Sequence, residues 1–166
     1  MKLRPATKED YDVLFELFSE TQTMHYVGMP DFFKPAKKDK FFYTYFVEVI
    51  KSEDKHLIIG FDNDKPFGYI YYVISKLQQN IYRTEERIMY INQIVVKKSY
   101  QGRGLGRALI NHAMQVAKKE KIKKIGLDVW LFNEGAMKFF HSQGFSAHSQ
   151  IMWNKIAEQS NFGLNF

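Results

Sequence analysis

A glycine-rich segment, QGRGLGR at positions 101–107, is the part of the sequence best suited to bind an anion. It follows an apolar stretch and precedes apolar residues at helical intervals, so it is predicted to open a helix. The first N–H groups of a helix lack intrahelical partners and carry the positive end of its dipole. Glycines let a ligand approach this backbone closely, and arginines add charge. The residues concerned are Gly102, Gly104, Gly106, Arg103 and Arg107.

Two common nucleotide-binding motifs do not fit this segment. A dinucleotide motif, G-x-G-x-x-G, that began at Gly102 would need glycine where Arg107 stands. The P-loop motif ends in Gly-Lys-Ser/Thr, which the segment lacks. The segment is therefore either a phosphate site of another kind or a tight turn whose glycines serve backbone geometry alone.

A second motif, NEGAMKFFHSQGF at positions 133–145, follows one predicted helix and one predicted strand later. Together with IVVKKSYQGRGLGRALI at positions 94–110, it resembles the signatures of the GNAT N-acetyltransferases, Gln/Arg-x-x-Gly-x-Gly/Ala and Asn-x-x-Ala-x-x-x-Tyr-x-x-x-Gly-Phe. Phe140 stands at the usual Tyr position. The resemblance is strong from about Tyr90 to Trp153. The matching residues are Gln101, Gly104, Gly106, Asn133, Ala136, Gly144 and Phe145.

The resemblance implies a fold and a cofactor site. The expected fold is α/β of mixed α+β character, with a central, mixed, mostly antiparallel splayed sheet flanked by helices on both faces. Acetyl-CoA would lie in the gap between the strand ending at Val96 and the strand through Leu127. The implied cofactor-binding residues are Ile94 and Val96 for the pantetheine arm, Gln101, Gly102, Arg103, Gly104, Leu105, Gly106 and Arg107 for the pyrophosphate, and Asn133, Ala136 and Phe140 on the following helix.

The usual acid–base residues of the family are not at their usual places. Acetyl transfer to an amine needs a neutral amine, a stabilised oxyanion and preferably a proton donor for the leaving thiolate. Where relatives often carry Glu, this sequence has Tyr90 and Asn92, and Phe140 has no hydroxyl. We predict direct attack by the amine, with deprotonation through water ordered by Asn92 or Tyr90. Each also has a structural explanation, as a half-buried tyrosine and a polar strand residue.

The apolar spacing predicts the elements that position these residues. A capping pattern at Thr7 to Asp10 opens a helix of about three turns. An irregular stretch at 24–39 follows. The remaining predictions are a second helix over 42–50, a β-hairpin around the turn at 62–66, a strand over 87–96, a helix from Leu105, a strand over 123–132, a helix from Asn133 to about Ser142, a last strand over 145–156 and, in addition, a short strand over 2–5.

Composition limits the class of protein. The 166 residues are 45% hydrophobic, which suits one globular domain over 1–166. Cysteine is absent, which excludes disulfides and thiolate chemistry, and the five histidines show no metal spacing, so no metal is expected. A net charge of +6 favours a polyanionic partner, which could be nucleic acid, a lipid surface or a phosphorylated cofactor, and charge alone does not choose among them. We see no leader, membrane span or nucleic-acid-binding module, and expect a cytoplasmic location without membrane or nucleic-acid partners.

The expected function is N-acetyl transfer from acetyl-CoA to a primary amine, a small molecule ahead of a protein, in a ternary complex. A protein Nα- or lysine acetyltransferase and a catalytically weak acyl-CoA-binding sensor are the alternatives. A homodimer is compatible with the resemblance. The acceptor is left open, because the segment expected to shape its pocket, 24–39, matches no motif; His25 near its start is the one histidine of interest.

Overall fold

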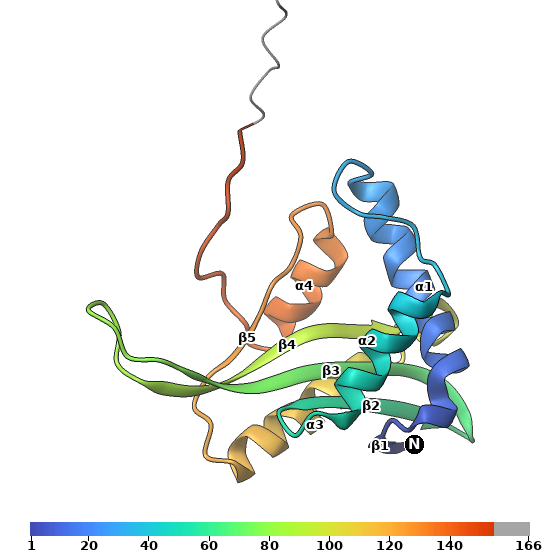
Figure 1. Cartoon of the computed structure of the whole chain (residues 1–166), viewed down its shortest axis with the longest axis horizontal. Coiled ribbons are helices and arrows are strands. Elements are labelled where there is room, and N and C mark those ends of the chain that lie inside the picture. Colours follow the sequence, from blue (N-terminus) through green and yellow to red (C-terminus); the bar gives the residue numbers. More distant parts are fainter. Residues whose placement is uncertain (155–166) are drawn as a thin grey trace, which may run out of the picture.

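A five-stranded sheet forms the centre of the molecule (Figure 1). The computed structural model describes residues 1–154. Within them the strands lie side by side in chain order, antiparallel throughout except for the parallel pair β4 and β5, which confirms the predicted mixed, mostly antiparallel sheet. The strands are β1 (Lys2–Pro5), β2 (Lys55–Asp62), β3 (Lys65–Leu77), β4 (Glu86–Val96) and β5 (Ile125–Leu127).

Helices cover both faces of the sheet, as predicted (Figure 1). On one face α1 (Tyr11–Gly28) lies over β3 and β4, and α2 (Lys40–Lys51) lies over β2. On the other face lie α3 (Leu105–Lys119) and α4 (Glu134–Ser142). Because side chains of a strand alternate between faces, the strands feed two separate cores. The α1/α2 core contains Leu14, Leu17, Phe46, Val49, Ile59, Tyr69, Tyr71 and Val95, and the α3/α4 core contains Ile70, Tyr72, Met89, Ile91, Leu109, Ile110 and Phe140.

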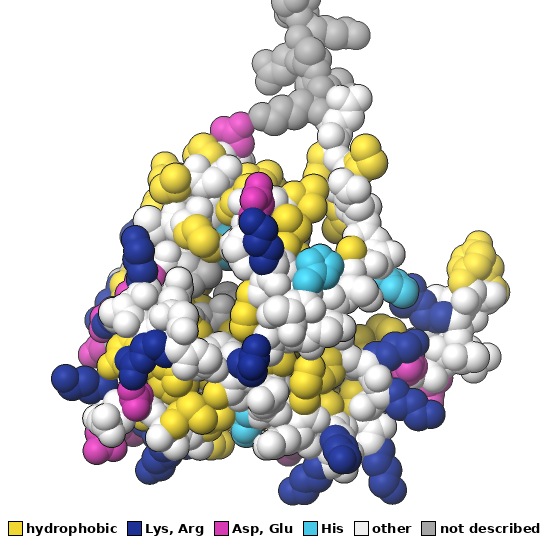
Figure 2. Space-filling model, turned by 180° about the vertical axis from the view of Figure 1, so that it is seen from behind, with side chains coloured by type: hydrophobic (Ala, Val, Ile, Leu, Met, Phe, Trp, Pro, Cys, Tyr) yellow, Lys and Arg dark blue, Asp and Glu magenta, His cyan; other side chains and the backbone are white. Residues whose placement is uncertain are grey.

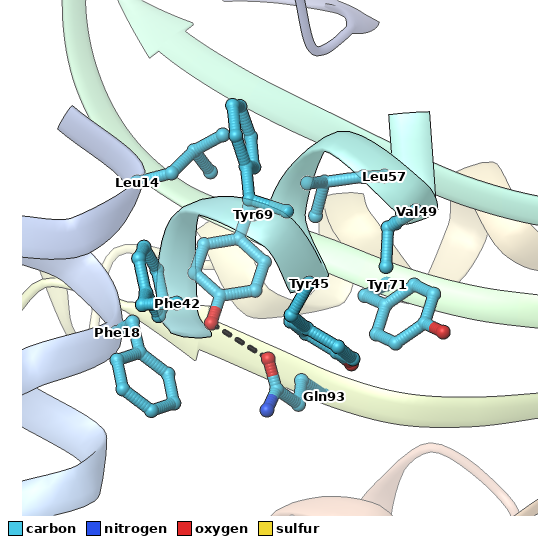
Figure 3. Close-up of a pocket in the computed structure, with 10 residues that line it drawn as sticks. Leu14, Phe18, Phe42, Tyr45, Val49, Leu57, Tyr69, Tyr71 and Gln93 are labelled. Atoms are coloured by element: carbon cyan, nitrogen blue, oxygen red, sulfur yellow. Dashed lines mark hydrogen bonds between the residues drawn. The ribbon is translucent and has the colours of Figure 1, made fainter. Parts of the chain in front are cut away.

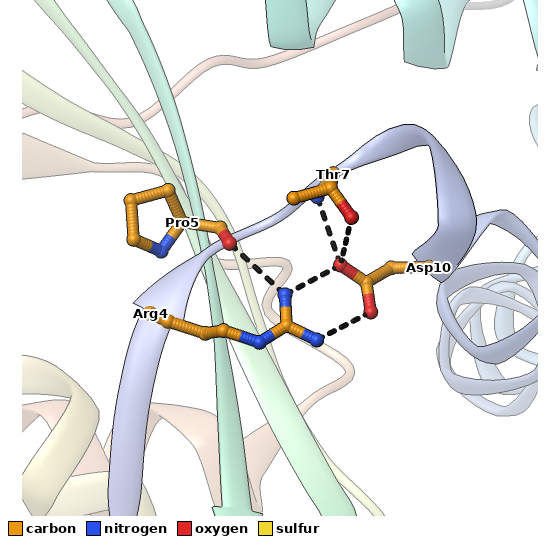
Figure 4. A network of polar contacts seen from close by, with 4 residues as sticks. All are labelled: Arg4, Pro5, Thr7 and Asp10. Atoms are coloured by element: carbon orange, nitrogen blue, oxygen red, sulfur yellow. Dashed lines mark hydrogen bonds and ion pairs between the residues drawn. The ribbon is translucent and has the colours of Figure 1, made fainter.

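The entry into α1 is fixed by a network around the Asp10 carboxylate (Figure 4). Arg4 on β1 donates two hydrogen bonds to it, at 2.6 and 2.8 Å. The Thr7 backbone N–H donates to the same carboxylate at 2.8 Å, which confirms the predicted capping pattern. The Arg4 guanidinium and these hydrogen bonds hold the pKa of Asp10 below its usual value, although burial opposes them. The network ties the first strand to the first helix.

The hairpin between β2 and β3 confirms the turn predicted at 62–66. Asn63 and Asp64 have φ values of 49° and 61°, the left-handed conformation at both central positions of a two-residue turn. Such turns match the right-handed twist of the flanking strands.

Three element predictions are wrong in extent or existence. The first helix runs to Gly28 instead of ending after about three turns, because no glycine or proline interrupts it before Gly28. The predicted strand over 123–132 forms a strand only over Ile125–Leu127, after which the chain leaves the sheet. The predicted last strand is absent over residues 145–154, which are mostly exposed; Lys155 and Ile156 lie outside the described residues.

Lys and Arg side chains are spread around the face seen in Figure 2, with acidic side chains between some of them, and do not gather in one patch. Within residues 1–154, no helix is both long enough and apolar enough to span a bilayer.

Candidate functional site

The sheet splays between β4 and β5, as expected. The two strands pair only from Met89 with Ile125 to Ile91 with Leu127. From residue 92 to residue 96, β4 has no partner on this side among residues 1–154. The side chains of Ile94 and Val96 pack against the α3/α4 core, so these residues would meet a ligand through their backbone. The gap is a place where an extended polar chain could hydrogen bond to a free strand edge.

A β-bulge lies where the two strands separate. Ile91 pairs with Tyr72 and Gln93 pairs with Tyr71, so Asn92 has no partner on β3. The Asn92 side chain is exposed. A bulge shifts the alternation of side chains by one residue, which brings Tyr90 and Gln93, rather than Tyr90 and Asn92, to one face. Asn92 therefore lies at the gap, but its side chain and that of Tyr90 are on different faces of the sheet.

The glycine turn has the geometry of an anion cradle. Gly102 and Gly104 have φ values of 75° and 77°, a conformation that favours glycine. A Cβ at either position would meet no atom within 4 Å, so the space above this backbone is open. Gly104 is the N-cap of α3, whose first N–H groups point outward at this place. These features fit the pyrophosphate that the sequence motif implies.

Gly106 brings the glycine-rich segment and the motif at 133–145 into contact. A Cβ on Gly106 would lie 3.1 Å from the ring of Phe139 on α4. The glycine therefore lets α4 pack closely against the start of α3. Leu105 packs into the same α3/α4 core.

The polar side chains of the turn differ in whether they already have partners within the protein. Gln101 donates its side-chain N–H to the Val96 carbonyl at 2.9 Å, which fixes the loop between β4 and α3. Arg103 pairs with Asp62 at 2.8 Å and lies over the Tyr100 ring, 5.1 Å from its centroid. Arg107 forms no ion pair with any residue from 1 to 154. Of the two arginines, Arg107 is the readier phosphate partner.

The predicted residues on α4 have structural partners. Asn133 is the N-cap: its Oδ1 accepts the Ala136 backbone N–H at 3.1 Å, which leaves the side-chain NH₂ for a ligand. Phe140 is 7% exposed and packs edge-to-face on Phe145 in the α3/α4 core. A buried phenyl ring can line a cofactor pocket, but it supplies no proton.

A hydroxyl and a carboxylate meet at the mouth of the gap. Tyr90 pairs with Gly126 across β4 and β5, and Asp128 follows two residues later. Burial raises the pKa of the Tyr90 hydroxyl, and a hydrogen bond to Asp128 and its negative charge raise this pKa further. A Cβ on Gly126 would lie 3.1 Å from the Tyr90 ring, so this glycine makes room for it. Tyr90 therefore stays protonated at neutral pH, beside a proton acceptor.

His25 belongs to an aromatic contact between the end of α1 and the loop that follows β5. It lies on α1, stacked on Phe33 with ring centroids 4.9 Å apart and edge-on to Phe132 at 6.0 Å. Trp130 contacts the same Phe33 ring at 4.9 Å. The segment after α1 and the loop between β5 and α4 therefore touch through rings. Burial lowers the pKa of His25, which favours its neutral form.

Sequence reasoning missed Asp128. The available signal was a lone acidic residue among apolar ones in the predicted strand over 123–132, LDVW at positions 127–130. Its significance depends on the parallel pairing of β4 with β5, because Asp128 follows directly after β5 and so comes within reach of Tyr90. No arrangement of three or more His, Cys, Asp or Glu residues that could hold a metal occurs within residues 1–154.

Comparisons with known proteins identify the family and the fold. Residues 13–145 match the family described as the acetyltransferase (GNAT) family. The chain is 32% identical over 95% of its length to the uncharacterized N-acetyltransferase MJ1207 of Methanocaldococcus jannaschii, and 29% identical over 68% of its length to N-alpha-acetyltransferase 30 of Schizosaccharomyces pombe. It spans 66% and 69% of those two proteins. In fold it is similar to a BH1408 tetramutant from Bacillus halodurans, with a TM-score of 0.89 at 24% identity over 94% of this chain and 100% of that one.

Proposed function

Since the chain belongs to the GNAT family of acetyltransferases, we propose that it transfers the acetyl group of acetyl-CoA to the primary amine of a small molecule. The observation that carries this proposal is the junction of two features at one end of β4. One is the open strand edge from residue 92 to residue 96, and the other is the glycine turn that follows it. Together they offer backbone partners for a long, phosphorylated cofactor.

Acetyl-CoA, when bound, supplies an activated thioester. The turn from Gln101 to Arg107 would hold its pyrophosphate, and Ile94, Val96 and Asn133 would hold its arm. Open space above Gly102 and Gly104 supports this assignment, because a ligand can reach the N–H groups there.

Tyr90 and Asp128 would manage the protons. The Tyr90 hydroxyl oxygen can accept a hydrogen from the amine while its own proton passes to the Asp128 carboxylate. The raised pKa of Tyr90 favours its protonated hydroxyl, which can give a proton to the leaving thiolate. Tyr90 would then take back the proton held by Asp128, so that the amine proton ends on the thiol and both residues return to their starting forms. This pair takes over the acid and base roles for which Phe140 and Asn92 are unsuited, and it makes a sensor without turnover the weaker proposal.

A protein N-terminus is the second candidate acceptor, and the similarity to N-alpha-acetyltransferase 30 favours it. The acceptor class, the homodimer and the cytoplasmic location stay predictions.

The test is CoA release with a panel of primary amines that includes alkylamines, polyamines, amino sugars and a peptide. Amine-dependent CoA release by the wild type, lost in Tyr90→Phe, is the expected result. Tight acetyl-CoA binding by calorimetry without amine-dependent CoA release would favour the sensor instead.

A further inference from the structure

Two hollows in the molecule differ in their lining and their size. The recess between α1, α2 and the sheet has mainly apolar and aromatic walls, and within it the Tyr69 hydroxyl donates to Gln93 Oε1 at 2.9 Å (Figure 3). Its enclosed part, about 30 Å³, has room for about one water molecule, so this recess is a feature of core packing. The second hollow is open and polar, and it measures about 350 Å³. That volume falls in the range of small-molecule sites, about 300 to 1,000 Å³.

The second hollow, called the basic hollow below, lies where the start of β4 meets the loop between α3 and β5. The Met89 N–H donates to the Lys124 carbonyl at 3.1 Å and so joins the two segments. The glycine turn follows the other end of β4, at a distance along the strand of roughly 30 Å. The basic hollow is therefore separate from the proposed pyrophosphate site. The residues that line it are Thr84, Glu85, Glu86, Arg87, Lys121, Lys123 and Lys124.

The two carboxylates of the basic hollow already have cationic partners. Glu86 accepts a hydrogen bond from Lys124 Nζ at 2.7 Å. Glu85 pairs with Lys76 on β3 at 2.8 Å. The negative charge of the lining is therefore neutralised within the protein.

Two lysines of the basic hollow have no such partner. Lys121 and Lys123 are exposed, and neither forms an ion pair with another residue of the described part, 1–154. Arg87 is engaged, because its guanidinium donates to the carboxylate and the backbone carbonyl of Glu120 at 3.2 and 3.1 Å. The free positive charge thus consists of two ammonium groups. Ammonium groups bind phosphate as point charges, whereas the planar arginine fork is the better match for a carboxylate, so the lining favours phosphate.

Lys121 stands at a backbone position that glycine usually occupies. Its φ is 56°, in the left-handed region, and it follows Glu120, the C-cap of α3. The Ile122 N–H donates to the Ala117 carbonyl at 2.8 Å, which completes the turn that ends the helix. Glycine adopts this φ without strain, and lysine does not. Lys121→Gly therefore removes the charge without harming the turn.

We infer that the basic hollow binds the terminal phosphate of a small phosphorylated molecule, with Lys121 and Lys123 as its partners. A phosphate monoester carries close to two negative charges above pH 7, which two ammonium groups balance. A nucleic-acid backbone carries only one charge for each phosphate, so it matches the pair of lysines less well. This inference goes beyond the proposed acetyl transfer and does not depend on it.

The test is an NMR titration with glycerol 3-phosphate at physiological ionic strength and slightly alkaline pH. The protein is saturated with CoA, so that the glycine turn is already occupied. The backbone amide signals of 84–87 and 121–124 should shift and saturate. Lys121→Gly should raise the Kd at least about threefold, and Lys121→Gly combined with Lys123→Ala at least about tenfold. Thermal melts should show no loss of stability in Lys121→Gly.

Lys119→Ala is the matched control for Lys123→Ala. Lys119 is also exposed and without an ion pair among residues 1–154, but it does not line the basic hollow. Its loss should change the Kd less than about twofold, whereas Lys123→Ala should raise it at least about threefold. Equal effects of the two variants would show that only the overall charge matters and would overturn the inference.

Two further ligands separate the chemical classes. Succinate carries two carboxylates, and a hexathymidylate strand carries phosphodiesters without a terminal phosphate. Both should bind at least about fivefold more weakly than glycerol 3-phosphate. The inference is overturned if either binds as tightly, or if the signals that glycerol 3-phosphate shifts lie outside 84–87 and 121–124.

Discussion

The two sides of β4 are built in different ways. On the cofactor side, the glycine turn and the cap of α4 each consist of residues within a few positions of one another. On the proposed acceptor side, Tyr90 on β4 meets Asp128 just after β5, and His25 on α1 meets Phe132 in the loop between β5 and α4. A local motif can specify cofactor binding by itself, whereas the acceptor side exists only once the sheet has formed. Because the two sides are built from different residues, we expect some variants to weaken acetyl-CoA binding and others to lower kcat alone.

Asp128→Asn should have the largest effect. The amide keeps the size of the side chain but cannot take the proton that Tyr90 passes on, so kcat should fall about 100-fold or more. The Kd for acetyl-CoA, measured by calorimetry, should change less than about twofold, because Asp128 is not among the residues proposed to hold the pyrophosphate or the arm. Asp12→Asn, an exposed carboxylate on α1, is the control and should keep full activity. Equal loss of acetyl-CoA binding in Asp128→Asn would contradict the separation of the two sides.

Gly104→Asp should weaken acetyl-CoA binding by at least tenfold, about 1.4 kcal/mol. The side chain would enter the open space above the turn and repel the pyrophosphate. Gly144→Asp provides the control for backbone strain, since Gly144 has a φ of 88° and also has open space at its Cβ. Calorimetry on both folded variants should show the loss only for Gly104→Asp. Matching losses would point to strain and remove the phosphate assignment.

Asp10→Asn should lower the free energy of unfolding by about 1 kcal/mol and leave both sides of the site intact. The value is modest because the Arg4 side chain is 34% exposed and the pair is partly screened. The pKa of Asp10 is lowered in the folded state, so its stabilisation is present above the unfolded pKa and is lost as pH falls through the folded one. Thermal melts of wild type and variant should therefore converge at low pH. A constant gap down to acid pH would contradict this origin.

The smallest effect is expected for Arg107→Ala, about a two- to threefold rise in the Kd for acetyl-CoA. An exposed arginine adds a charge contact that salt screens, so the difference from wild type should shrink at high ionic strength. Arg103→Ala should change the Kd less, because Arg103 is already paired with Asp62. The reverse order would show that the Asp62 pair opens when acetyl-CoA binds.

Sequence patterns predicted the features that depend on neighbours in the chain. The turn at Gly102 and Gly104, the Asn133 cap and the Asn63–Asp64 hairpin all have the expected geometry. Each is decided by backbone sterics or a hydrogen bond within three residues, which a sequence displays directly.

Features that depend on pairing between distant segments could not be predicted. Asp128 reaches Tyr90 only through the parallel register of β4 and β5, and the bulge at Asn92 changes which residues share a face. The alternating pattern at 145–156 predicted a strand, yet alternation forms a strand only when a neighbouring edge accepts it, and none does over residues 145–154.

The most direct test of acetyl transfer is a single turnover. The complex of the protein with acetyl-CoA is mixed with excess hexylamine, quenched with acid, and its products are identified by mass spectrometry. We predict one N-acetylhexylamine and one CoA for each acetyl-CoA bound. Acetyl-CoA that stays intact with hexylamine, and with every other amine of the panel, would contradict the account.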